Sequence, residues 1–260
     1  MTGLLKPLQW LYVIYALIIF IVPMLVIFPL ALVAMLFGRI KGGYLIYRLC
    51  MVWADIWFPL VFIPHRNIYE EKPESGKAYI FVANHTSYMD AAIIPKAIRQ
   101  PVRPLGKVEM ARIPIFGFIY KNVIVTVDRS SPENRAASVR ILRSVLSKGI
   151  SVLVFPEGTF NETGNPLKEF YDGAFRIAIE TGTPIMPILF LDSYDRMDQS
   201  SLFSLNPGKS RAVFLASIAT TGLTLQELPA LKQQAYAIME NKLRQYKASW
   251  IKPPASESEV

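Results

Sequence analysis

The chain has 260 residues, a formal net charge of +8, a pI near 9.5 and a mean hydropathy of +0.30. With 52% hydrophobic residues it is too apolar for an ordinary soluble enzyme, and its basic charge favours anionic lipid surfaces, acidic carriers or phosphorylated substrates as partners. Nucleic acid fits less well as a partner, because the basic residues are dispersed along the chain. The single cysteine, Cys50, excludes an internal disulfide and favours a reducing, cytoplasm-facing location.

Residues 10–37 form an apolar stretch of 28 residues without a charge. As one helix it would be about 42 Å long, more than the roughly 30 Å of bilayer hydrocarbon. Pro23 divides it into halves of 13 and 14 residues, each too short to span a membrane alone. Both flanks carry basic residues: Lys6, Arg39, Lys41 and Arg48. The positive-inside tendency places both flanks on the cytoplasmic side, which predicts a helical hairpin dipping into one leaflet of the cell membrane. A single kinked span is the alternative.

A second apolar stretch, residues 44–63, is interrupted by Arg48 and Asp55 and is rich in tryptophan and tyrosine. This composition is typical of an interfacial helix with aromatic rings at headgroup depth, although a helix packed on a globular domain would look similar. We therefore divide the chain into membrane-anchoring helices (1–63), an α/β domain (64–252) and a tail (253–260). We expect the α/β domain to lie on the cytoplasmic face.

The rest of the chain alternates predicted strands with predicted helices. Short apolar runs indicate strands at 78–83, 102–107, 123–127, 150–155, 184–191 and 211–219. Amphipathic segments, two of them opened by capping boxes, indicate helices at 90–98, 130–148, 174–182 and 224–246. This alternation predicts an α/β fold with a mostly parallel sheet flanked by helices.

The first polar cluster, residues 84–90, follows the strand at 78–83 and contains one of only two histidines in the chain. Asp90 lies five positions after His85, a spacing that lets the strand end, turn and start a helix so that the carboxylate folds back onto the imidazole. Such a pair makes the histidine a general base, and the hydroxyl that it activates would belong to the substrate. A histidine held in an ordinary turn network is the alternative.

The second cluster, residues 155–159, also follows an apolar strand. Parallel strands that end at one sheet edge would bring it near His85. Gly158 permits a tight turn with exposed backbone N–H groups, and Thr159 adds a hydroxyl, so the loop is suited to binding the oxygens of a polar headgroup. Glu157 lies in the same loop. An ordinary turn is the alternative.

Two cations are predicted at the same edge, since Lys107 and Arg129 each follow a strand. Arginine binds phosphate in a fork geometry, which suits an anionic acceptor, but a salt bridge from Arg129 to Asp128 or Glu133 is an equal alternative. Residues 113–117 form an apolar turn that fits either an acyl groove or simple core packing.

Four blocks of this sequence resemble one known family. They are His85 with Asp90, residues 107–129, residues 155–159 and residues 184–187. Through these blocks, in the family's order, residues 78–188 are similar to the lysophosphatidic acid acyltransferase family, the bacterial 1-acyl-sn-glycerol-3-phosphate acyltransferases. The similar stretch is just under half of the chain, and residues 10–37 are like the family's membrane-anchoring helices only in their apolar character.

The resemblance implies transfer of a fatty acyl group from a thioester, on acyl carrier protein or coenzyme A, to the free hydroxyl of 1-acylglycerol-3-phosphate, which forms phosphatidic acid. It makes His85 the base and Asp90 the residue that orients it. It assigns acceptor binding to five residues: Glu157, Gly158, Thr159, Arg129 and Lys107. No metal or cofactor is implied beyond the thioester donor. The expected partners are membrane lipids, the lyso-lipid acceptor and the thioester carrier.

The sequence departs from the family's pattern after Thr159, where Phe160 stands at a position that is commonly arginine. Tyr171 likewise stands near a common lysine position, and Lys168 or Arg176 are the nearby cations that would compensate. The departure leaves room for another acceptor, such as a lyso-aminoacyl lipid. A catalytically silent membrane lipid-binding protein is an alternative of another class, which the intact His85 and Asp90 disfavour.

Overall fold

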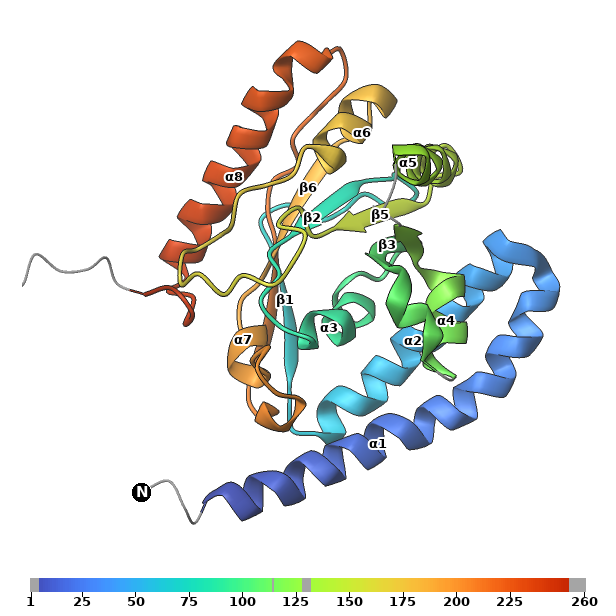
Figure 1. The fold of residues 1–260 in the computed structure, drawn as a ribbon, viewed down its shortest axis with the longest axis vertical. Helices are drawn as coiled ribbons and strands as arrows, with labels where there is room; N and C mark the ends of the chain where they lie inside the picture. Colours follow the sequence, from blue (N-terminus) through green and yellow to red (C-terminus); the bar gives the residue numbers. More distant parts are fainter. Residues whose placement is uncertain (1–4, 114, 128–131, 253–260) are drawn as a thin grey trace, which may run out of the picture.

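The computed structural model describes residues 5–113, 115–127 and 132–252, and Figure 1 shows their arrangement. The helices are α1 (Leu5–Ala34), α2 (Gly38–Leu60), α3 (Met89–Ala97), α4 (Phe116–Val123), α5 (Pro132–Leu146), α6 (Gly173–Thr181), α7 (Ser193–Arg196) and α8 (Leu228–Gln245). The strands are β1 (His65–Tyr69), β2 (Ile80–Ala83), β3 (Val102–Lys107), β4 (Val125–Val127), β5 (Ser151–Val154), β6 (Ile185–Phe190) and β7 (Ser210–Phe214). Short 3₁₀ helices are η1 (Met35–Phe37), η2 (Val108–Arg112), η3 (Leu202–Ser204) and η4 (Leu225–Glu227).

The strands form one sheet in the order β1-β7-β6-β2-β5-β3-β4. Every neighbouring pair is parallel except β6 and β7, which are antiparallel. The prediction of a mostly parallel sheet flanked by helices is therefore confirmed. Because β2, β5, β3 and β4 run in the same direction, the loops that follow them emerge at one edge of the sheet.

Alternate residues of β2 contribute to two separate cores, one on each face of the sheet. Phe81 and Ala83 pack in the cluster that includes α2 and α3, whereas Ile80 and Val82 pack in the cluster that includes α5, α6 and α8. Figure 1 shows these two helical layers on opposite sides of the sheet. Burial of both faces explains why β2 reads as a continuous apolar run rather than an alternating one.

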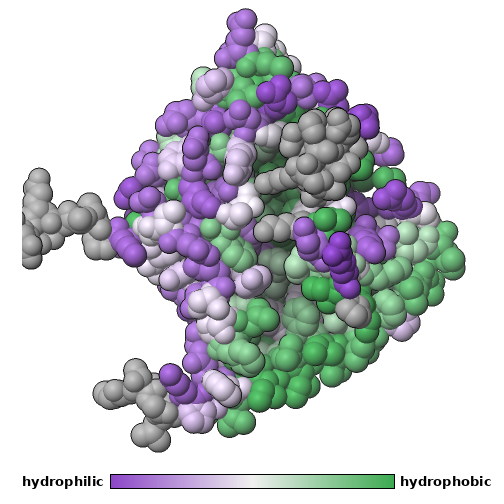
Figure 2. Space-filling model, in the orientation of Figure 1, coloured by the Kyte–Doolittle hydropathy of each residue, from purple (hydrophilic) through white to green (hydrophobic). Residues whose placement is uncertain are grey.

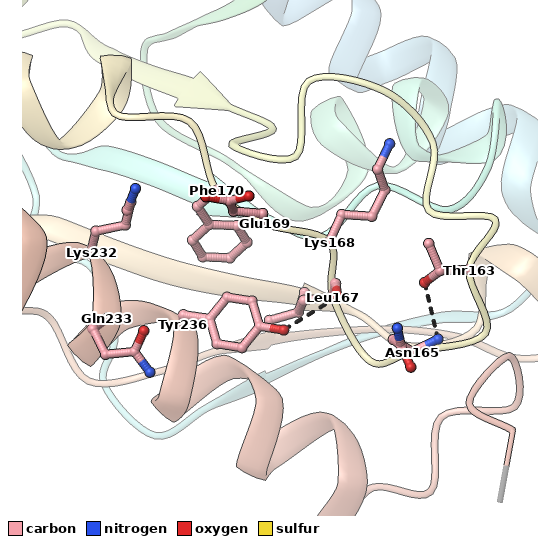
Figure 3. A pocket seen from close by; sticks show the side chains of 9 residues that line it. All are labelled: Thr163, Asn165, Leu167, Lys168, Glu169, Phe170, Lys232, Gln233 and Tyr236. Atoms are coloured by element: carbon pink, nitrogen blue, oxygen red, sulfur yellow. Dashed lines mark hydrogen bonds between the residues drawn. The ribbon is translucent and has the colours of Figure 1, made fainter. Parts of the chain in front are cut away.

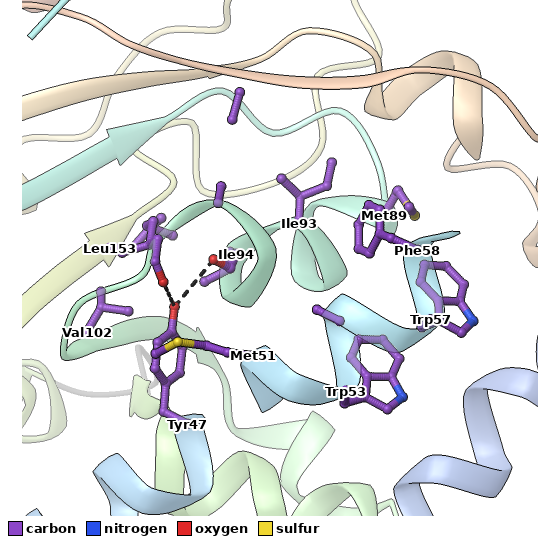
Figure 4. Close-up of a cluster of buried hydrophobic side chains, with 14 of the residues drawn as sticks. Tyr47, Met51, Trp53, Trp57, Phe58, Met89, Ile93, Ile94, Val102 and Leu153 are labelled. Atoms are coloured by element: carbon purple, nitrogen blue, oxygen red, sulfur yellow. Dashed lines mark hydrogen bonds between the residues drawn. The ribbon is translucent and has the colours of Figure 1, made fainter. Parts of the chain in front are cut away.

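Helix α2 packs directly on the sheet domain. The Tyr47 hydroxyl donates to the carbonyl of Ile98 at 2.8 Å, and Trp57 and Phe58 are buried among residues of α3 (Figure 4). Of the two alternatives for residues 44–63, the structure has the helix packed on the domain. The predicted division at residue 63 therefore passes through one continuous core. That residues 1–63 anchor the protein in a membrane stays a prediction.

Helix α1 continues through Pro23 and Pro29, and the chain reverses only at η1. The hairpin turn predicted at Pro23 is wrong, since a proline removes one hydrogen bond from a helix that its neighbours continue. The reversal instead uses Gly38, whose φ of 79° is easily reached without a side chain. Gly42 then lets α2 start close to the Ala34 carbonyl, where a Cβ would clash.

Most large apolar side chains of α1 are exposed, and in Figure 2 the apolar colouring gathers where Figure 1 draws α1 and α2. Among the described residues, one helical stretch, Lys6–Leu60, is long and apolar enough to cross a membrane by length and composition. Because α1 carries no charge from Trp10 onward and exposes its apolar side chains, it indicates membrane association.

Strand β1 and helix α4 differ from the sequence prediction. Strand β1 was not predicted, because it is short and polar and pairs only with β7 at the edge of the sheet. Residues 116–123 form helix α4, where we expected an apolar turn followed by a strand from residue 123. A short apolar run does not distinguish a helix from a strand by its periodicity, and here the strand begins only at Val125.

Candidate active site

The loop after β2 is fixed to the neighbouring strand and to the segment after α7. The Asn84 side chain donates to the carbonyl of Phe190 at 3.0 Å and accepts from its N–H at 2.8 Å, so it continues the pairing of β2 with β6. Ser87 accepts from the N–H of Met89 at 2.9 Å and donates to the carbonyl of Met197. These bonds hold the loop in place and start α3 at the position that Asp90 requires.

His85 and Asp90 are in direct contact. The Nδ1 atom of His85 lies 2.8 Å from Oδ2 of Asp90, which also accepts the backbone N–H groups of Thr86 and Ser87 at 3.0 Å each. Asp90 is fully buried, while the His85 side chain is 21% exposed. Because Nδ1–H points at the carboxylate, the lone pair of the neutral ring lies on Nε2, where a proton can be accepted.

Aromatic rings surround the imidazole of His85. The Phe155 ring stacks on it with centroids 3.9 Å apart and an angle of 14°, and the Phe160 ring lies 4.3 Å away. Tyr88 makes an edge contact with Phe160 at 4.8 Å. The rings restrict the orientation of the imidazole and line the approach to it with apolar surface.

Glu157 links the loop of His85 to the loop that follows β5. Its Oε1 accepts the backbone N–H of His85 and its Oε2 accepts the backbone N–H of Lys168, each at 2.9 Å, and the residue is 1% exposed. Burial raises the pKa of Glu157 to about 7, although the two N–H donors act in the opposite direction. These contacts favour a positioning role for Glu157 over the predicted contact with substrate, which stays untested.

Gly158 and Thr159 form the turn beside this anchor. Gly158 has a φ of 75°, and its N–H is bonded to the carbonyl of Phe155 at 3.0 Å rather than exposed as we predicted. The Nζ of Lys168 donates to Oγ1 of Thr159 at 2.5 Å and lies 3.5 Å from the carbonyl of Phe160. A cation therefore lies at the loop despite the phenylalanine at position 160.

The two other predicted cations are only partly placed. Lys107 is the last residue of β3 and pairs with Val127 of β4, so its backbone lies at the expected edge of the sheet. Its side chain is not described, and Arg129 lies outside the described residues. Their predicted roles stay predictions.

Asn161 was missed by the sequence interpretation. Its backbone N–H donates to the carbonyl of His85 at 2.7 Å, and its buried side chain donates to the carbonyl of Asn165 at 2.9 Å and accepts from Thr163. An asparagine two residues before Thr163 and three before Gly164 is a typical turn signal, which could have indicated a structured loop.

A pocket of about 520 Å³ lies on the other side of this loop, against α8 (Figure 3). Lys168 lines it together with Tyr236, whose hydroxyl donates to the carbonyl of Leu167 at 3.3 Å. His85 and Asp90 do not line it. Within the described ranges, no group of three or more histidine, cysteine or carboxylate side chains could hold a metal ion.

The comparisons with known proteins show which family the chain belongs to. Residues 65–191, from β1 to the end of β6, match the family model described as Acyltransferase. The chain is 32% identical over 207 residues to a putative 1-acyl-sn-glycerol-3-phosphate acyltransferase, acl-2, of Caenorhabditis elegans, covering 76% of this chain and 70% of that protein. It is 28% identical over 180 residues to 1-acyl-sn-glycerol-3-phosphate acyltransferase BAT2 of Brassica napus chloroplasts, covering 69% of this chain.

The crystal structure of the 1-acyl-sn-glycerophosphate acyltransferase PlsC from Thermotoga maritima has the same fold, with a TM-score of 0.73 and 22% sequence identity. The alignment covers 95% of this chain and 98% of that one. The fold and the matched region thus define an acyltransferase-type α/β domain with N-terminal apolar helices. The chain belongs to the 1-acyl-sn-glycerol-3-phosphate acyltransferase family. It spans about half the length of the Brassica protein, 52%.

Proposed function

We propose that this protein transfers a fatty acyl group from an acyl thioester to the free hydroxyl of 1-acylglycerol-3-phosphate and so forms phosphatidic acid. The contact between His85 and Asp90, at 2.8 Å, is the observation that carries the proposal. Relatives named for this activity are similar to this chain over 69% and 76% of its length. The acyl donor would be a thioester of acyl carrier protein or coenzyme A, with no further cofactor.

In the proposed reaction His85 acts as a general base. Its Nε2 takes the proton of the acceptor hydroxyl while the hydroxyl oxygen bonds to the thioester carbonyl carbon. The tetrahedral intermediate then collapses, the carbon–sulfur bond breaks, and the leaving thiolate takes the proton from the imidazolium. The products are the new ester and the free thiol, and His85 returns to its neutral form.

Asp90 supports both states of the base. Its buried carboxylate fixes the ring through Nδ1, and among the described residues His85 is the basic side chain that pairs with it. When the imidazole takes a proton, the two residues form an ion pair in a site of low polarity, where the attraction is stronger than in water. The pair therefore stabilises the charge that develops in the transition state.

The acceptor would be held by the loop at Gly158 and Thr159. Lys168 supplies a positive charge beside this loop through its bond to Thr159. Lys107 and Arg129 are proposed to add further positive charge for the acceptor phosphate. The catalytic domain would face the cytoplasm, where thioester donors are made, with α1 in the cell membrane.

Thiol release by the purified protein tests this proposal. With an acyl thioester and 1-acylglycerol-3-phosphate, the wild type should release thiol at a rate that depends on the acceptor. The His85→Gln variant should lose this release by about 10²- to 10⁴-fold, the usual contribution of a general base. Acceptor-dependent release at the wild-type rate by a folded His85→Gln variant would contradict the mechanism.

A second candidate keeps the chemistry and changes the acceptor to another lyso-lipid, such as a lyso-aminoacyl lipid. The Phe160 ring, 4.3 Å from the His85 ring, favours it, because an uncharged aromatic side chain occupies the approach to the base. A panel of lyso-lipids offered with one thioester distinguishes the two candidates. Faster transfer to acceptors without a phosphate monoester would support the second.

A further inference from the structure

The segment between α7 and β7 carries an exposed apolar tip beside the start of α1. Leu202 and Phe203, in η3, are 61% and 57% exposed. The ring of Phe203 lies 5.8 Å from that of Trp10, which is itself 59% exposed, and Gln9 donates to Asn206 at 3.4 Å. Figure 1 shows this segment next to the N-terminal part of α1.

The tip extends the apolar surface of α1. Residues 10–37 carry no charge, and their exposed side chains include Leu11, Ile14 and Leu17. Because Phe203 touches Trp10, the two apolar side chains of the tip are continuous with this surface rather than scattered on the protein. A bilayer is the partner that would cover an uncharged surface of this length together with the tip beside it.

We infer that Leu202 and Phe203 form a second membrane-contact element, which enters the lipid interface beside the first turns of α1. Lys6 and Trp10 lie at the same end of the molecule, and a basic residue next to a tryptophan is typical of headgroup depth. Leucine and phenylalanine side chains at this level bury their apolar surface at the boundary of headgroups and acyl chains. The protein then has two contacts with the membrane, from segments far apart in the sequence.

The second contact is linked to the site. The segment that leads to the tip bonds to the loop of His85 at two points, since Ser193 lies 3.1 Å from the Thr86 hydroxyl and Met197 accepts from Ser87. A tip held at the lipid interface would therefore fix the loop of His85 relative to the membrane surface. This arrangement suits a base that must meet the hydroxyl of a lipid held in that surface.

Site-specific quenching by labelled lipids tests the inference. Single cysteines are placed at Leu202, at Leu17 as the α1 reference and at Leu225 as a matched exposed leucine on η4, all with Cys50→Ser. Each variant carries a fluorophore and is bound to vesicles of phosphatidylcholine and phosphatidylglycerol, with or without doxyl-labelled lipid. We expect doxyl lipid to quench the labels at 202 and 17 and to leave the label at 225 unchanged.

Quenching at 17 without quenching at 202 would overturn the inference. A second copy of the chain that covered the tip would give this same result. The double variant Leu202→Asp, Phe203→Asp gives a second measurement. It should transfer acyl groups more slowly to an acceptor in vesicles and at the wild-type rate to the same acceptor dispersed in detergent. Equal slowing in both media would contradict a membrane role. Quenching needs no turnover, so failure of the proposed function leaves its result readable.

Discussion

The loops around His85 bury polar side chains, whereas the surface of α1 exposes apolar ones. In the loops, polar side chains such as Asp90, Glu157 and Asn161 are buried, and they are bonded to backbone groups of their own loop or of the neighbouring loop. On α1, most large apolar side chains are exposed. The polar groups of the site are therefore satisfied within the chain. The apolar surface of α1 instead indicates contact with lipid.

The two regions also contribute to different free energies, the loops to folding and α1 to membrane binding. A buried carboxylate that loses a partner leaves backbone N–H groups unsatisfied, so the loops respond sharply to single polar changes. An exposed leucine on α1 contributes to membrane binding and little to the folding free energy. Substitutions of Asp90, Trp57, Glu157 and Phe160 test the loops and the helical packing.

Asp90→Ala should give the largest loss, a decrease in kcat of about 10²- to 10⁴-fold. His85 would lose the carboxylate that orients its ring and stabilises its protonated form. Acyl transfer to a detergent-dispersed acceptor measures it. Asp192→Asn is the matched control, since Asp192 is also buried but is paired with Arg211 at 2.7 and 2.8 Å. Equal losses of kcat in the two folded variants would contradict a specific role for Asp90.

Trp57→Ala should lower the free energy of unfolding by about 3 to 5 kcal/mol, the usual effect of removing a buried large aromatic side chain. Trp57 is 3% exposed and its indole N–H donates to the carbonyl of Ala16, so the change also loosens α1 from α2. Unfolding in detergent micelles measures it. Trp10→Ala, at an exposed position of the same helical pair, should change stability little and membrane binding more.

Glu157→Gln tests the buried carboxylate by the pH dependence of stability. Because burial raises the pKa of Glu157 to about 7 from 4.5, the folded state holds the proton more tightly than the unfolded state. This contribution is fully present below about pH 4.5 and is lost as the pH rises through about 7. Over that range the wild type should lose up to about 3 kcal/mol relative to Glu157→Gln. Parallel pH profiles of unfolding would contradict the raised pKa.

Phe160→Arg should have the smallest effect, a shift of about tenfold in acceptor preference toward lyso-lipids that carry a phosphate monoester. The arginine would add a charge beside Lys168 and remove the ring next to His85. Phe160→Leu is the control that removes the ring without adding charge. If the two variants choose the same acceptors, the residue at this position does not set the preference by charge.

Much of this fold could be predicted from the sequence, because β2, β5 and β6 are short apolar runs that end at polar loops. The pairing of His85 with Asp90 also followed from local spacing, since strand, turn and helix occupy consecutive residues. The anchoring of the His85 loop by Glu157 depends on a contact between segments that are distant in the sequence. Such contacts follow from the order of strands in the sheet, which the sequence does not specify.

The N-terminal region shows the opposite balance. Its apolar composition predicted a membrane anchor, but the position of the reversal depended on backbone freedom at Gly38 and close packing at Gly42 rather than on the prolines. Helix α4 was missed for a related reason, since an apolar run of that length fits a helix or a strand. Packing against α2 decides between them.

Mass spectrometry of lipid products tests whether this protein forms phosphatidic acid and whether His85 is required. Membranes that contain equal amounts of the wild type or of His85→Ala are supplied with one acyl thioester and a mixture of lyso-lipid acceptors. We expect the wild type to form phosphatidic acid from 1-acylglycerol-3-phosphate, and the variant to form no more than membranes without the protein. Formation of phosphatidic acid by His85→Ala at the wild-type rate would contradict this expectation.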